Sequence, residues 1–93
     1  MLKLTKLSAT WCAPCKAFAK IFDNVKEMEE FSDITFEEYD IEDDDKGVEL
    51  GEKFRVTALP CVLFTNENDE LIYKLSGALP QSRFVELIKE KMQ

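Results

Sequence analysis

The first 41 residues combine two hydrophobic patterns in an order that leaves few possible folds. Residues 2–8, LKLTKLS, predict a strand, and residues 14 to about 30 have the three-four spacing of an amphipathic helix. Residues 34–41, ITFEEYDI, predict a second strand, and its Glu37 and Glu38 are typical of a sheet edge. A strand, a helix and a strand in this order predict a parallel strand pair with a right-handed crossover. The apolar positions of the helix are Phe18, Ile21, Phe22, Val25 and Met28.

The second half of the chain predicts a short helix followed by a hairpin. The acids at 43–45 offer N-caps for a helix that ends near Phe54. Residues 61–65, CVLFT, form a nearly continuous apolar run, which is typical of a central strand covered on both faces. Residues 71–76, LIYKLS, follow an acidic turn and predict the second arm of the hairpin, with Leu71, Tyr73 and Leu75 facing inward.

A closing helix begins around Pro80, where a first-turn proline is tolerated. Its apolar face consists of Phe84, Leu87, Ile88 and Met92. The whole order is β-α-β-α-β-β-α, so we expect an α/β fold with a four-stranded mixed sheet flanked by helices.

Length and charge narrow the function classes. With 93 residues and 45% apolar content, the chain has material for one domain, which we expect over 1–93. The net charge is -7 and the basic residues are scattered, so we expect no nucleic-acid partner. The N-terminus lacks the apolar core of a signal peptide, and no stretch approaches a membrane span of ~20 residues. We therefore expect a soluble, cytoplasmic protein without a membrane partner.

The stretch TWCAPCK at 10–16 places two of the three cysteines at the junction of the first strand and the first helix. Such a pair can be a redox couple, half of a metal site or a structural staple. A disulfide framework favours an even cysteine count and a secreted chain, and three cysteines without histidine cannot supply the usual four zinc ligands. We therefore expect redox chemistry with no metal and no bound cofactor.

Three stretches in this order resemble the thioredoxin family. SATWCAPCK resembles the thioredoxin active site, whose usual form is WCGPCK; ALP at 58–60 resembles the loop that ends in a cis-proline; LSGA at 75–78 resembles the glycine turn before the last helix. The strand and helix that precede the active-site strand in full-length thioredoxins are absent. The resemblance therefore implies a minimal thioredoxin-like fold.

The roles of the two cysteines follow from their positions. A thiolate is the attacking species, yet an unperturbed cysteine is only about 3% ionised at pH 7. Cys12 lies at the start of the helix, where free N–H groups favour an anion, and Cys15 lies one turn further, where its S–H can donate to the Cys12 sulfur. We expect Cys12 to be the nucleophile and Cys15 the resolving thiol.

The resemblance implies further site residues. Ala13 and Pro14, between the cysteines, and Gly77 are expected to contact the substrate. Pro60 is expected to be cis and opposite Cys12, which leaves the backbone of Leu59 free to pair with an extended substrate segment. Trp11 either packs beside the site and guides a substrate or simply fills the core.

Two residues are candidate modulators of the thiols. Lys6 occupies the position where thioredoxins usually carry a buried aspartate, so it either points inward, as a cation near the thiols, or extends to solvent. Cys61 follows Pro60 and either opens a central strand as a small apolar residue or contacts the substrate.

The leading hypothesis is a protein dithiol-disulfide oxidoreductase. The resemblance implies protein disulfides as substrates, a thioredoxin-reductase-type electron donor, and ribonucleotide reductase as a possible client. One alternative is a glutathione-coupled glutaredoxin, which the chain length favours but the negative charge disfavours. Another is a binding module without enzymatic activity, in which Cys12→Ser would leave function intact.

Overall fold

The computed structural model describes residues 1–93 and contains one sheet of four strands in the order β2-β1-β3-β4. β1 (Lys3–Ser8) pairs in parallel with β2 (Thr35–Asp40) and antiparallel with β3 (Cys61–Thr65). β4 (Leu71–Ser76) pairs antiparallel with β3. The predicted mixed sheet, the parallel first pair and the hairpin are therefore confirmed.

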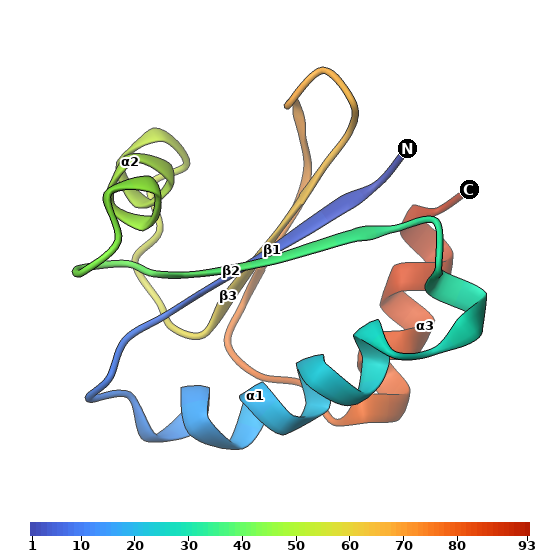
Figure 1. Cartoon of the computed structure of the whole chain (residues 1–93), viewed down its shortest axis with the longest axis horizontal. Coiled ribbons are helices and arrows are strands. Elements are labelled where there is room, and N and C mark those ends of the chain that lie inside the picture. The colour runs from blue at the N-terminus through green and yellow to red at the C-terminus, as the bar shows by residue number, and fades with distance from the viewer.

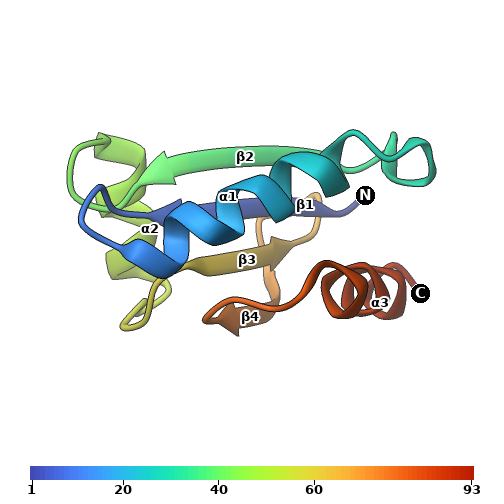
Figure 2. The ribbon, with the colours of Figure 1, turned by 90° about the horizontal axis from the view of Figure 1, so that it is seen from below.

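Helices cover both faces of this sheet (Figures 1 and 2). α1 (Ala13–Lys26) and α3 (Gln81–Lys91) lie on one face, where they enclose the main core with β1 and β3. α2 (Asp45–Lys53) lies on the other face, at the upper left of Figure 1, over a smaller cluster built on Leu7, Cys61 and Leu63. None of the helices is long and apolar enough to cross a membrane.

The main core is aromatic. The Phe18 and Phe84 rings meet edge to face with their centroids 5.1 Å apart, and Phe22 contacts both Phe84 and Phe36. Such pairs stabilise a core beyond their buried area by about 0.5 to 1.5 kcal/mol each. A small domain has little other apolar material, so these contacts hold α1 and α3 against the sheet.

The first helix is shorter than its pattern predicts. α1 ends at Lys26 rather than near residue 30, and Met28 has extended dihedral angles of φ -70° and ψ 129°. A single 3-10 turn, η1 (Glu29–Phe31), follows and buries Phe31. The apolar spacing continues through Met28 because the turn still packs on the core, although the helix has ended.

The inward alternation expected of the last strand is wrong at Leu71, whereas Tyr73 shares the inward face and packs edge to face on Phe64, although it remains partly exposed. Leu71 is 39% and Tyr73 37% exposed, and only Leu75 is buried. An irregularity between Phe64 and Thr65 shifts the register, so Tyr73 opposes Phe64 while Leu71 opposes Thr65. The two side chains therefore lie on opposite faces of an edge strand, because one extra residue breaks the period of two.

Two close backbone contacts, one at Gly47 and one at Gly77, hold the loops near the start of α1 in place. A Cβ added at Gly47 would lie 1.9 Å from the carbonyl oxygen of Asp40, so α2 packs against the end of β2 only because residue 47 is glycine. Gly77 has φ 93° and donates its N–H to the carbonyl of Pro60 at 2.8 Å. The end of β4 is thus bonded to the loop that precedes β3.

Candidate functional site

Cys12 and Cys15 form a disulfide at the N-terminus of α1. Cys12 is the N-cap residue, with φ -90° and ψ 104°, and its Sγ accepts a hydrogen bond from the backbone N–H of Cys15 at 3.2 Å. Pro14 lies in the first turn, where its missing N–H leaves no helical bond unmade. A negative charge that forms on the Cys12 sulfur after reduction therefore faces an N–H donor and the positive end of the helix.

The loop before β3 packs against these cysteines. Cys12, Cys15 and Ala9 form a buried cluster with which Ile41 and Leu59 are in contact. The Leu59–Pro60 peptide bond is cis, as the sequence predicts. Neither the N–H nor the C=O of Leu59 takes part in a backbone hydrogen bond of the protein. An extended chain lying beside the disulfide could therefore pair with Leu59.

Trp11 does not fill the core. Its side chain is 67% exposed, and its indole Nε1–H donates to Oε1 of Glu42 at 2.8 Å. The sequence reasoning missed Glu42, although a signal existed. Trp11 follows β1 and Glu42 follows β2, and the ends of neighbouring parallel strands meet at the same sheet edge.

Lys6 points inward, as the first of its two expected orientations has it, but its contacts are with Glu38 and Phe22 rather than with the thiols. Its side chain is 4% exposed, and Nζ lies 2.9 Å from Oε1 of Glu38, its direct neighbour on β2, and 5.2 Å from the ring centre of Phe22. The second Glu38 oxygen contacts Lys26 of α1 at 3.3 Å. Burial alone would raise the pKa of Glu38, but the hydrogen bonds and charges of Lys6 and Lys26 outweigh it, so the pKa is lowered.

Cys61 is completely buried and is not part of the disulfide. Burial raises the pKa of its thiol to about 11, and the charge of Lys74 opposes this only in part. A thiol with this pKa and no exposure is a poor nucleophile at neutral pH. The packing interpretation of Cys61 is therefore favoured over contact with substrate.

We expect iodoacetamide to distinguish Cys12 from Cys61. After reduction at about pH 8, the native protein should incorporate label at Cys12, where the helix N-terminus favours the thiolate, and none at Cys61, which is completely buried and has a raised pKa. Mass spectrometry of the digested protein measures this directly. Label on Cys61 should appear when the same sample is unfolded in urea, and rapid native labelling of Cys61 would contradict its assignment as an inert core residue.

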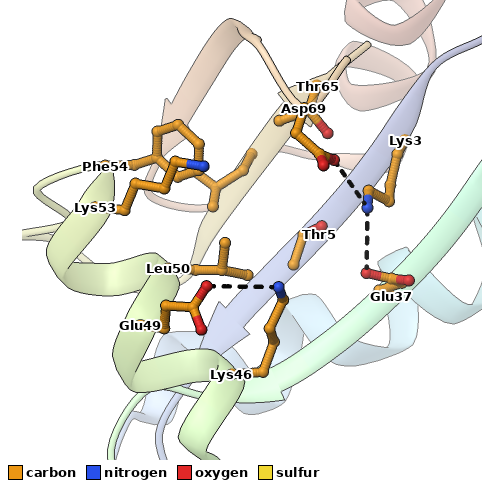
Figure 3. Close-up of a pocket in the computed structure, with 11 residues that line it drawn as sticks. Lys3, Thr5, Glu37, Lys46, Glu49, Leu50, Lys53, Phe54, Thr65 and Asp69 are labelled. Carbon is orange, nitrogen blue, oxygen red and sulfur yellow. Dashed lines mark ion pairs between the residues drawn. The ribbon is translucent and has the colours of Figure 1, made fainter. Parts of the chain in front are cut away.

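The cavity shown in Figure 3 is separate from the disulfide. It lies between α2 and strands β1 to β3, encloses about 50 Å³ and has no cysteine in its wall. Lys3 contacts Asp69 at 3.5 Å and Glu37 at 3.9 Å, and Lys46 contacts Glu49 at 3.7 Å. Two of the three lysines in the wall of this cavity are thus already paired with carboxylates, and Cys12 and Cys15 lie outside it.

This chain is similar to thioredoxins in sequence and in fold. The Thioredoxin family model matches residues 2–90. The chain is 31% identical to the thioredoxin of Ophiophagus hannah over 91 residues, which is 98% of this chain and 80% of that protein. It is 35% identical to a thioredoxin of Aspergillus fumigatus over 73 residues, which is 78% of this chain but only 63% of that protein.

The crystal structure of Malassezia sympodialis thioredoxin superposes with a TM-score of 0.82 at 22% identity. The match covers 99% of this chain and 76% of the Malassezia chain. At this identity the likeness concerns the fold, and it agrees with the minimal version of that fold expected from the sequence.

Proposed function

This chain belongs to the thioredoxin family of dithiol-disulfide oxidoreductases, and on that premise we propose that Cys12 and Cys15 are its redox pair and that it reduces disulfides of other proteins. The observation that carries the proposal is the Cys12–Cys15 disulfide at the N-terminus of α1, with the Cys15 N–H directed at the Cys12 sulfur.

The exchange proceeds in two steps. In the reduced protein the Cys12 thiolate attacks one sulfur of the substrate disulfide, forms a mixed disulfide and releases the other substrate sulfur as a thiolate. Cys15 then loses its proton and attacks Cys12 Sγ, which breaks the mixed disulfide and releases the second substrate thiolate. Two electrons pass to the substrate, and the protein ends with the Cys12–Cys15 disulfide. Because the two Cα atoms are 5.3 Å apart, the second step is intramolecular and fast.

The residues around the pair hold the substrate in this proposal. Leu59, whose backbone groups are free, pairs with an extended substrate segment, while Pro60 and Gly77 keep the loop in place through the bond between them. Ala13 and Pro14 are exposed beside the cysteines, and Trp11 presents its indole to solvent. In this proposal, these residues form the surface on which a substrate disulfide approaches Cys12.

The Lys6 ammonium is neutralised by Glu38, so we do not expect it to stabilise a thiolate strongly. Lys6 is then a minor modulator of the potential, and Cys61 acts only through packing. The protein would therefore work as a reductant in the cytoplasm, with a thioredoxin-reductase-type donor and with clients such as ribonucleotide reductase. A glutathione-coupled role is disfavoured because the exposed carboxylate of Glu42, which is bonded to Trp11 beside Cys12, repels an anionic tripeptide.

The reduction potential of the Cys12/Cys15 pair tests this proposal. The protein is equilibrated with graded ratios of reduced and oxidised dithiothreitol, and the fluorescence of Trp11, the only tryptophan, reports the redox state. We expect a potential near about -270 mV, the value typical of a thioredoxin. A potential tens of millivolts less negative would indicate an oxidant or glutaredoxin-like role, and a pair that does not form the disulfide would refute the proposal.

A further inference from the structure

We propose that Trp11 and Glu42 together select substrates that carry a basic residue, best an arginine, next to the reacting disulfide. The inference rests on the proposed function and names the substrate class of the same site. Glu42 is the new element, because nothing in the exchange chemistry itself requires a carboxylate at this position.

The first step is the geometry of the indole. Trp11 directly precedes the nucleophile Cys12 and is 67% exposed. Its Nε1–H is bonded to Glu42 Oε1 at 2.8 Å, so the ring is fixed at its edge while its large apolar area remains open to solvent. A fixed, exposed aromatic face is a good surface for a planar guanidinium, which stacks on it through cation-π attraction.

The second step is the charge at the edge of that face. Glu42 is exposed and takes part in no salt bridge, so its carboxylate is not compensated, and its second oxygen is free to accept a further hydrogen bond. Its backbone N–H donates to Oδ1 of Asp40 at 2.8 Å, which anchors the residue to the end of β2. Lys16, the cation that is nearest to Cys12 along the chain, forms no ion pair with Glu42 either.

The third step is the fit of a ligand. An arginine stacked on Trp11 can direct its N–H groups at Glu42, so one side chain uses both features at once. A glutamate in the same place meets the Glu42 charge and an indole face that repels anions. The carboxylate therefore favours basic flanks and also discriminates against acidic ones.

Three peptides test the proposal. Each has one intramolecular disulfide, and they differ only in the residue beside the first cysteine, which is arginine, glutamine or glutamate. Each oxidised peptide is mixed with reduced protein in a single turnover, quenched with acid and analysed by mass spectrometry. We expect the second-order rate constant for the arginine peptide to exceed that for the glutamate peptide by about 10-fold at low salt, and the ratio to decrease in about 0.5 M NaCl.

Glu42→Gln is the decisive variant, because the glutamine amide oxygen can still accept the indole N–H while the charge is lost. We expect it to lower the arginine-to-glutamate ratio to about 2-fold or less with little change for the glutamine peptide. Glu29→Gln is the matched control, since it removes the same charge at the far end of α1 and should keep the full ratio.

The outcomes separate the two proposals. Equal rates for all three peptides in the wild-type protein, or an equal loss of selectivity in Glu42→Gln and Glu29→Gln, overturn the role of Glu42 while leaving the oxidoreductase intact. Absence of reduction of any peptide refutes the proposed function itself.

Discussion

Replacing Cys12 by serine should abolish the reduction of protein disulfides. A hydroxyl is not ionised at neutral pH and does not attack a disulfide sulfur, so neither the N-cap position nor the Cys15 N–H can restore the reaction. In an insulin-reduction assay with dithiothreitol as the electron source, we expect the variant to be indistinguishable from the background without protein.

The matched variant Cys15→Ser should behave differently. Its Cys12 thiolate can still form the mixed disulfide, but no resolving thiol follows, so the substrate remains covalently attached. Non-reducing mass spectrometry should show an adduct of one protein and one substrate peptide, which dithiothreitol releases. Accumulation of the adduct in Cys12→Ser instead would reverse the two roles, and a wild-type protein that reduces no disulfide would favour a binding module.

Cys61→Ala is the control for the loss of activity in the Cys12→Ser variant. Cys61→Ala removes a buried thiol that takes no part in the proposed exchange, so it should retain activity even though the small cavity lowers its stability. All variants should give the same far-ultraviolet circular dichroism as the wild-type protein. Loss of activity in Cys61→Ala with a preserved fold would place Cys61 in the site.

Much of this architecture was predictable because the signals are local. A strand, a helix and a strand specify the parallel pair, and the continuous apolar run at 61–65 specifies the central strand. The disulfide pair lies within one helical turn, so its members are neighbours wherever a helix begins after Cys12. The features that were wrong, the end of α1 and the face on which Leu71 lies, depend on how distant segments pack together rather than on the local sequence pattern.

The partners of the site residues were not predictable in the same way. Glu42 is 31 residues from Trp11, and Glu38 is 32 residues from Lys6, so each pair depends on the register of β1 against β2. A shift of that register by one residue would turn Glu38 to the opposite face and place Glu37 or Tyr39 beside Lys6 instead. The orientation of Lys6 is therefore determined by its neighbour on β2 rather than by its own sequence context.

Glu38→Gln should destabilise the protein more than Lys6→Met does. Removing the carboxylate leaves a 4% exposed ammonium without its anion, and breaking a fully buried pair costs about 3 to 5 kcal/mol. Because Glu38 is itself 39% exposed, water reaches the pair, and we expect a smaller loss, about 2 kcal/mol, in the free energy of unfolding by urea. Lys6→Met removes the buried charge but keeps an apolar stem against Phe22, so it should lie within about 1 kcal/mol of the wild type.

The double variant and the pH dependence test whether the unpaired Lys6 ammonium causes the instability of Glu38→Gln. Lys6→Met combined with Glu38→Gln should be nearly as stable as Lys6→Met alone, since no unpaired ammonium remains. The pKa of Glu38 is lowered in the folded state, so its pairing stabilises the protein above its ordinary pKa of 4.5 and is lost as the pH falls through the lower folded value. The difference in stability between the wild type and Glu38→Gln should therefore narrow as the pH falls below 4.5. If Lys6→Met were as unstable as Glu38→Gln at neutral pH, the ion pair itself, rather than the need to neutralise a buried cation, would hold β1 to β2.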